Sequence, residues 1–363
     1  MKVLIISGSY PPIRCGVSEG TVKLSTYLRK LGVTTKILTS TAAHKDDWSL
    51  PLINSWTFGA LGTVLKTVTA EKPDLIHIEY PAIPYGRKPF INFLPLFLRL
   101  RFPRIPVVIR VHEYHDASLL GRIRILITVL FANRLVIPNR ESIEKISRIL
   151  PWKKFDHIQI GSNIAVIPLS DKLRQDLIGR FELGQKQVVT YFGLVDPSKG
   201  VEQLLSSLDQ WPANSKLVIA THYNNQNDFH RQLKQLVDES RGQAVWTGFL
   251  EEPDISGILQ LSDLVTLPFD QPISLRRGSM LAAIVHGIPV ITTGPASPPL
   301  IDGENIIALP DNESDTIAKA VNRLLTDDKL RKLLRVGALK LASNFDWTEI
   351  AKKHLRIYEE LAN

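Results

Sequence analysis

Short apolar runs rich in β-branched residues alternate with longer amphipathic stretches along most of the chain. In the first part these runs cover residues 2–7, 35–40, 75–79, 107–112 and 134–138. The amphipathic stretch between the first two runs covers residues 17–31, and Leu24, Leu28 and Leu31 recur in it at helical spacing. Near-continuous apolar strands separated by helices are typical of parallel strands buried on both faces. The pattern predicts a Rossmann-like α/β domain over residues 1–165.

The same alternation begins again after residue 186. Its apolar runs cover residues 188–192, 216–221, 244–247, 264–267, 288–293 and 306–309. We therefore predict a second doubly wound domain at 187–344, a linker at 166–186, and a terminal helix at 345–363 that crosses back to the first domain. Ligands of such folds bind beyond the carboxyl ends of the strands, so we expect a site in the cleft that the two domains face.

Length and composition agree with two soluble domains. A chain of 363 residues is too long for one ordinary core, and 44% hydrophobic with 22% charged residues is typical of globular proteins. The single cysteine, Cys15, excludes a disulfide framework and fits a reducing compartment. Since we find neither a signal peptide nor a run of about 18 apolar residues, we expect a cytoplasmic protein.

The formal net charge of +8 favours anionic partners. The sequence shows no basic helix, zinc-ligand spacing or Arg/Lys–aromatic repeat of the kind that nucleic-acid-binding proteins carry. This argues against nucleic acid and leaves phosphorylated small molecules or an anionic membrane surface.

Three loops at predicted strand ends are candidate anion sites, because the first N–H groups of a helix are unpaired and carry the positive end of its dipole. The first, at 7–20, is rich in glycine, and the second, at 191–200, has Gly193 at its turn and Lys199 before a helix. Both also fit ordinary solvated turns. The third places Arg276, Arg277, Gly278 and Ser279 at a helix start, where an arginine pair favours an anion site over ordinary surface charges.

One histidine also ends a predicted strand. His112 follows the run "VVIRV". A lone histidine is usually structural, but its position at a strand end of a doubly wound domain fits a functional role equally well. Glu113, His115 and Asp116 crowd the same turn, but they do not make a convincing ligand set. We therefore predict no metal site.

The order of these motifs resembles the retaining GT-B glycosyltransferases of family four, the glycosyl transferases group 1. The opening "MKVLIISGSYPPIRCGVSEG" is similar to that family's first strand and glycine-rich loop, and "VVTYFGLVDPSKGVEQLL" to its Lys-Gly turn. "PVVIRVHEY", "VWTGFLEEPDI", "HGIPVITT" and "FDWTEIAKKHL" follow its later segments. The resemblance covers essentially the whole chain.

The resemblance implies a transfer of a sugar from a nucleoside-diphosphate sugar to a hydroxyl acceptor, with retention of anomeric configuration, in polysaccharide or glycoconjugate biosynthesis. It implies that Gly16 lies near the donor diphosphate, that His112 contacts the transferred sugar, and that Lys199 neutralises the diphosphate. Phe249 and Leu250 would line the base pocket. No metal or other cofactor is expected, because fixed cations and helix N–H groups would stabilise the leaving group.

The sequence departs from the family in the donor pocket. The two glutamates that the family carries eight positions apart correspond here to Ser274 and Ala282, and its arginine before the Lys-Gly turn corresponds to Leu194. In one interpretation Arg276 and Arg277, with the N–H groups of Gly278 and Ser279, replace the missing charge. In the other, the chain is a weak or inactive nucleotide-sugar-binding partner subunit. Epimerases and phosphorylases share the architecture, so the fold alone does not decide the chemistry.

The segment at 85–106, "YGRKPFINFLPLFLRLRFPRIP", combines apolar residues with five cations. It could contact an anionic membrane peripherally, which would suit a lipid-linked acceptor. The interpretation that we favour is a buried helix of the first domain, interrupted at Pro95.

Overall fold

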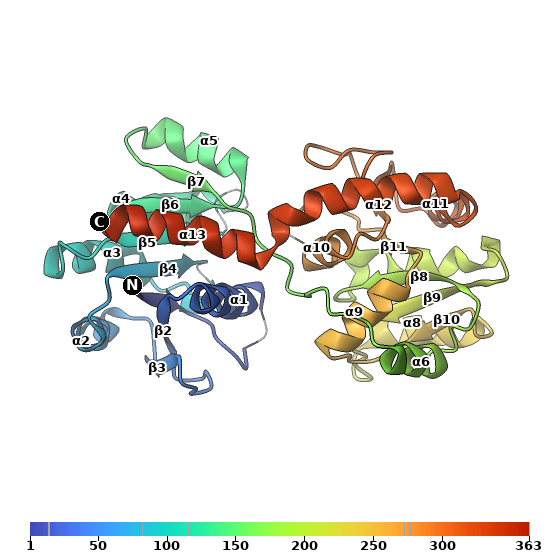
Figure 1. Cartoon of the computed structure of the whole chain (residues 1–363), viewed down its shortest axis with the longest axis horizontal. Coiled ribbons are helices and arrows are strands. Elements are labelled where there is room, and N and C mark those ends of the chain that lie inside the picture. The colour runs from blue at the N-terminus through green and yellow to red at the C-terminus, as the bar shows by residue number, and fades with distance from the viewer. Residues whose placement is uncertain are drawn as a thin grey trace. The chain divides into compact units, whose positions relative to one another are not determined.

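The chain folds into two compact units in a computed structural model that describes residues 1–13, 15–81, 83–112, 114, 117–271, 273–275 and 277–362. The first unit combines Met1–Gly161 with Trp347–Asn363, and the second comprises Ser162–Asp346 (Figure 1). Each is a parallel sheet covered by helices, so the predicted class of two Rossmann-like α/β domains is confirmed.

The sheet of the first unit has seven parallel strands in the order β3-β2-β1-β4-β5-β6-β7. The chain starts in the middle of the sheet, runs to one edge, then returns beside β1 and runs to the other edge. Its strands are β1 Lys2–Ser7, β2 Thr34–Ser40, β3 Ser49–Ile53, β4 Leu75–Tyr80, β5 Val107–Val111, β6 Arg134–Ile137 and β7 Phe155–His157.

Helices cover both faces of this sheet, because successive strand residues point to opposite sides. Leu4 and Ile6 of β1 pack with α2, α3, α4 and α5, whereas Val3 and Ile5 pack with α1 and the C-terminal helix α13. The helices are α1 Gly16–Lys30, α2 Leu61–Glu71, α3 Phe90–Arg101, α4 Leu119–Leu130, α5 Arg140–Ile149 and α13 Trp347–Ala362.

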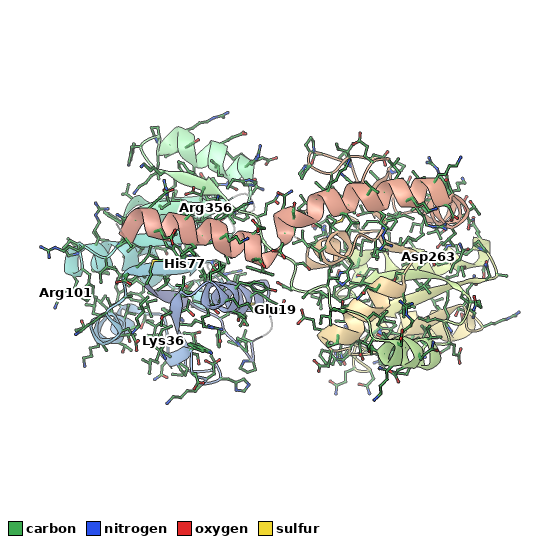
Figure 2. The ribbon with its side chains drawn as sticks, viewed as in Figure 1. Glu19, Lys36, His77, Arg101, Asp263 and Arg356 are labelled. Carbon is green, nitrogen blue, oxygen red and sulfur yellow. The ribbon has the colours of Figure 1, made fainter. Side chains whose placement is uncertain are left out.

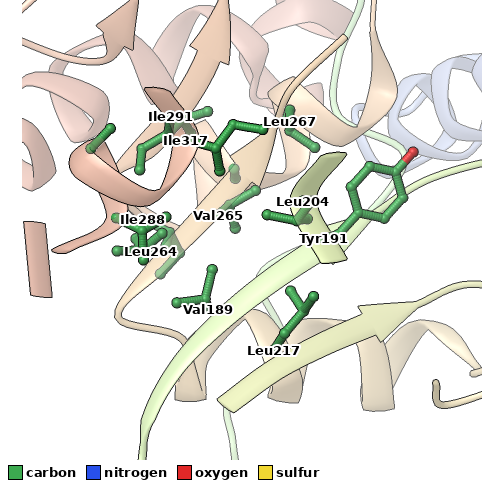
Figure 3. Close-up of a cluster of buried hydrophobic side chains, with 14 of the residues drawn as sticks. Val189, Tyr191, Leu204, Leu217, Leu264, Val265, Leu267, Ile288, Ile291 and Ile317 are labelled. Carbon is green, nitrogen blue, oxygen red and sulfur yellow. The ribbon is translucent and has the colours of Figure 1, made fainter. Parts of the chain in front are cut away.

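The second unit repeats this plan with six parallel strands in the order β10-β9-β8-β11-β12-β13. They are β8 Gln187–Phe192, β9 Ser215–Ala220, β10 Ala244–Trp246, β11 Leu264–Leu267, β12 Val290–Thr293 and β13 Ile307–Leu309. The helices are α6 Asp171–Arg180, α7 Val201–Ser206, α8 Asp228–Glu239, α9 Glu252–Leu261, α10 Gly278–Val285, α11 Ser314–Thr326 and α12 Asp328–Ala342. Val189, Leu217 and Val265 of the central strands belong to its main core, with α7 and α11 packed over them (Figure 3).

The segment predicted as a linker at 166–186 is instead structured and belongs to the second unit. Ser170 caps α6, since its side chain accepts a hydrogen bond from the N–H of Leu173. Leu169, Leu173 and Leu177 recur every fourth residue and lie against α9 at Gly257. The prediction was wrong because an apolar stripe of three leucines among polar residues gives only a weak helical pattern.

Two further expectations need correction. The edge strands β3 and β7 were not predicted, because "SLPLI" contains a proline and "FDH" is mostly polar, as edge strands tolerate. Helix α3 is buried on one face, as expected, but it runs through Pro95 without interruption. The buried Leu94 and Leu98 on either side provide packing that offsets the lost backbone hydrogen bond. No helix within the described part of the chain is long and apolar enough to cross a membrane.

The close approach of Gly200 to the backbone at Pro268 offers a test of this architecture. Gly200 has φ +67°, and a Cβ there would lie 1.9 Å from the carbonyl oxygen of Pro268. Gly200→Ala should therefore lower the free energy of unfolding by about 3 kcal/mol or more, because it combines a clash with left-handed strain. Urea unfolding measures the loss.

The matched control is Gly242→Ala. Gly242 has φ +83°, but nothing lies within 4 Å of the position that a Cβ would take there, so only the left-handed strain of about 1 kcal/mol applies. Equal losses in the two variants would contradict the close approach.

Candidate functional site

The candidate anion site of the second unit lies where the strand order reverses. Strands β8 and β11 are neighbours in the sheet although three helices and two strands separate them in sequence, so their carboxyl ends open beside each other. The loop after β8 contains the short 3-10 turn Pro197–Lys199, and the loop after β11 begins at Pro268. Gly200 lets these two loops meet, and the N–H of Asp270 donates a hydrogen bond to the carbonyl of Ser198.

Lys199 is positioned by this turn. Asp196 caps the turn by accepting from the N–H of Ser198, and the Lys199 ammonium lies 3.4 Å from the Asp196 carboxylate. Burial acts to raise the pKa of Asp196, but hydrogen bonds from Ser198 and the charge of Lys199 outweigh it and hold that pKa below its ordinary value. Lys199 remains about one quarter exposed, so its charge is available to a ligand.

Arg277 reaches the same place from the other loop. Its guanidinium stacks 4.1 Å from the centre of the Phe269 ring, and the Lys199 ammonium lies 5.7 Å from the same ring. Cations over an aromatic face are attracted by the negative face of the ring. Phe269 itself is almost fully buried, so it forms a fixed support for two positive side chains that come from the loops after two different strands.

Gly193 and Leu194, two positions singled out in the sequence, lie in the loop directly after β8. Gly193, with φ +138°, lies beside Ser279, since a Cβ on Gly193 would be in ordinary contact with the Ser279 Cβ at 3.5 Å. The buried Tyr191 hydroxyl donates to the carbonyl of Leu194, whose own side chain is 80% exposed. Burial and the charge of Asp196 raise the pKa of Tyr191, so this hydroxyl stays protonated and holds the turn.

Helix α10 begins at Gly278, immediately after Arg277. The space beside Gly278 is open within 4 Å, which leaves the helix start accessible. Arg276 and the residues Glu113, His115 and Asp116 lie outside the described residues. At the two positions where the family carries glutamates, this chain has Ser274 and Ala282, neither of which has a carboxylate. Ala282 is fully buried in the core, and the carbonyl of Ser274 accepts a hydrogen bond from the N–H of Arg277.

Phe249 and Leu250 follow the edge strand β10 rather than the central strands. The Phe249 side chain is about half exposed, whereas Leu250 is buried in a cluster with α6 and α9. Their expected role at a nucleotide base stays a prediction.

In the first unit, Gly16 is the first residue of α1, directly after the loop that leaves β1. The side chain of Cys15 caps this helix by accepting from the N–H of Ser18. Nothing lies within 4 Å of the position that a Cβ on Gly16 would take, so a ligand can approach the helix start closely.

His112 follows β5 and is anchored by a residue that the motif analysis missed. Its Nε2 lies 2.6 Å from Oε2 of Glu79, a buried carboxylate on the neighbouring strand β4. Oε1 of Glu79 lies 3.2 Å from Nε2 of His77 and 3.5 Å from Nη1 of Arg110. Burial acts to raise the pKa of Glu79, but Arg110 and hydrogen bonds from His112 and His77 hold that pKa well below its ordinary value.

A charged residue near the end of an otherwise apolar strand was the signal that could have revealed Glu79. Phe269 offered a weaker signal, since an aromatic residue after a strand is common. Across the described ranges no cluster of three or more His, Cys, Asp or Glu residues could hold a metal ion. The expected absence of a metal therefore stays a prediction.

Known proteins resemble parts or all of this chain. Residues 186–327 match the family described as Glycosyl transferases group 1. The serotype-specific mannosyltransferase WbdA of Escherichia coli is 26% identical over 207 residues, which are 54% of this chain but only 24% of WbdA. The chain thus aligns with about a quarter of that relative.

Solved structures extend the likeness to the whole chain. HepE of Anabaena in complex with UDP-glucose superposes with a TM-score of 0.72 at 17% identity, over 99% of this chain and all of HepE. Sucrose-phosphate synthase of Thermosynechococcus elongatus gives 0.69 at 18% identity, over 99% of both chains. The protein has the GT-B glycosyltransferase fold. The match to the glycosyl transferases group 1 model lies within its second unit, and this is the family that the motifs resemble.

The helix that starts at Gly278 ends at a buried histidine, which makes stability depend on pH. His286 donates from Nδ1 to the carbonyl of Ala282 at 2.7 Å, and its Nε2 accepts from the Ser256 hydroxyl at 2.9 Å. Burial lowers the pKa of His286 below 6.5. The unfolded chain therefore binds more protons than the folded one as pH falls below about 6.5, and stability declines.

Urea unfolding at pH 7.5 and pH 5.5 checks this coupling. The wild type should lose stability on acidification, and His286→Gln should lose less, because the group that takes up the proton on unfolding is gone. The exposed His222 provides the control, and His222→Gln should behave as the wild type. An unchanged acid loss in His286→Gln would contradict the role assigned to this histidine.

Proposed function

We propose that the protein transfers a sugar from a nucleoside-diphosphate sugar to a hydroxyl acceptor, with retention of configuration at the anomeric carbon. The observation that carries this proposal is the convergence of Lys199 and Arg277 on the Phe269 ring where β8 and β11 end. A guanidinium and an ammonium on a fixed support suit a diphosphate, because a guanidinium can bind phosphate through two parallel hydrogen bonds and an ammonium supplies a compact positive charge. The fold, which HepE shares in complex with UDP-glucose, agrees with such a donor.

The residues take the following roles in this proposal. Lys199 and Arg277 neutralise the leaving diphosphate, while the N–H groups of Gly278 and Ser279 at the start of α10 donate to its oxygens. Arg276 joins them as the second arginine of the pair. No metal is needed, since the protein's own cations meet the charge that develops.

Phe249 and Leu250 line the pocket of the base in the same unit. In the first unit, Gly16 lies near the donor phosphates and His112 contacts the transferred sugar near the reacting carbon. The reaction proceeds by displacement on the face from which the diphosphate leaves, and that diphosphate takes the proton of the acceptor hydroxyl. This course needs positioning and charge stabilisation rather than a pair of catalytic carboxylates.

The alternative is a nucleotide-sugar-binding partner subunit with weak or no transfer. It is favoured by the absence of a carboxylate at Ser274 and at the buried Ala282. We favour the enzyme, because Lys199 and Arg277 both lie over the buried Phe269 ring. Polysaccharide or glycoconjugate biosynthesis in the cytoplasm is the proposed setting, and the mannosyltransferase relative suggests a hexose.

Nucleotide binding tests the donor site directly. In a thermal-shift screen with EDTA present, one family among UDP, GDP, ADP and TDP should raise the melting temperature of the wild type. Arg277→Ala should weaken that binding roughly 10- to 100-fold, since a hydrogen bond to a charged group contributes about 1.5–3 kcal/mol.

The matched control is Arg231→Ala, which removes an exposed arginine that is paired with Asp228 in the same unit. It should bind nucleotide as the wild type does. Binding without transfer to any tested acceptor would favour the partner subunit, and a screen without any shift would count against both forms of the proposal.

A peripheral contact with an anionic membrane belongs to the same proposal. Arg99 and Arg101 are exposed at the end of α3, and Arg101 projects from the edge of the first unit (Figure 2). Leu100 between them is 72% exposed, and the adjacent α4 carries Leu119 and Leu120 at 76% and 68%. Exposed leucines flanked by arginines suit the boundary between headgroups and acyl chains.

Vesicle sedimentation tests this contact. Arg99→Gln/Arg101→Gln should weaken binding to phosphatidylserine-containing vesicles about 30-fold, because each cation contributes about 1 kcal/mol near such a surface. Lys172→Gln/Arg174→Gln removes the same charge from exposed positions of the second unit and should bind as the wild type does. Equal binding by both variants would contradict the assignment of this surface.

A further inference from the structure

A buried carboxylate lies directly behind His112, and the proposed mechanism does not yet use it. Glu79 is 1% exposed and stands at the carboxyl end of β4, next to the turn that carries His112. Burying a charge is unfavourable unless partners meet it. The arrangement of those partners shows which groups carry protons.

Glu79 remains ionised, so both of its oxygens act only as acceptors. The contact of 2.6 Å between Oε2 and Nε2 of His112 therefore requires a hydrogen on Nε2. The same holds for Nε2 of His77, which lies 3.2 Å from Oε1. Arg110, also 1% exposed, provides the positive charge that balances the carboxylate.

The chain of hydrogen bonds continues to the C-terminal helix. Nδ1 of His77 lies 2.8 Å from the hydroxyl of Tyr358 on α13. Burial raises the pKa of Tyr358 well above its ordinary value, so the hydroxyl keeps its proton and can donate it to Nδ1. His77 is thereby held between Glu79 and Tyr358, and the position of Glu79 is held in turn.

We propose that Glu79 is the positioning residue for His112: it keeps the hydrogen on Nε2 and fixes the ring through that bond. Nδ1 is then the nitrogen that remains for another partner, and the 12% of the side chain that is exposed gives that partner access. In a histidine ring, the hydrogen bond that one nitrogen makes to a fixed partner sets the state of the other nitrogen. This inference rests on the proposed function, in which His112 contacts the transferred sugar.

The first test uses the wild-type chain without ligand. Histidine labelled with ¹⁵N distinguishes protonated from bare ring nitrogens by NMR, and the His112 signals are assigned by their loss in His112→Gln. Nε2 should be protonated at pH 7.5. A bare Nε2 would overturn the proposal, whatever the protein binds or transfers.

The second test separates positioning from folding. In Glu79→Gln the amide group can donate to Nε2 and so reverse the hydrogen bond, which moves the ring proton to Nδ1. We expect kcat to fall about tenfold or more with KM changed less than about threefold, together with the altered ¹⁵N pattern of His112. An unchanged kcat and an unchanged ¹⁵N pattern would overturn the proposal.

Asp156→Asn is the matched control, since Asp156 is a strand carboxylate of the same sheet that pairs with Arg134. It should leave kcat and the His112 signals unchanged. If Glu79→Gln does not fold because Arg110 loses its counter-charge, the wild-type spectrum decides alone. A chain that binds no nucleotide but protonates Nε2 would refute the proposed function and leave the Glu79–His112 bond in place.

Discussion

The close approach of Gly200 to the carbonyl of Pro268 is the constraint on which the candidate donor site depends. It brings the turn after β8 onto the loop after β11, and only a residue without a side chain fits there. Because the two loops meet, a lysine from one and an arginine from the other reach the same buried ring at Phe269. The site is thus a consequence of strand order combined with one glycine.

The two units handle charge in different ways. In the second unit, Lys199 and Arg277 remain partly exposed, so their charges can meet a ligand. In the first unit, Glu79 and Arg110 are buried and balance each other, and Glu79 contacts the partly exposed His112. An exposed cation pair suits binding of an anion, whereas a buried network suits the fixing of one side chain in one state.

Much of the fold could be predicted from the sequence, because strands buried on both faces must be continuously apolar. The central strands were found for that reason, while the edge strands β3 and β7 were missed because water on one side permits Pro51 and Asp156. The positions of Lys199 and Arg277 were predicted from strand ends and motifs. Their meeting at Phe269 and the pairing of Glu79 with His112 depend on neighbouring strands, which no local pattern reveals.

The central claim is that the second unit binds a nucleoside diphosphate through Lys199 and Arg277. A crystal structure of the protein with its preferred nucleoside diphosphate tests this most directly. The account predicts that the phosphate oxygens lie within ion-pair distance of the Lys199 ammonium and the Arg277 guanidinium, beside the start of α10. A diphosphate bound elsewhere, with both cations still on Phe269 and Asp196, would contradict it.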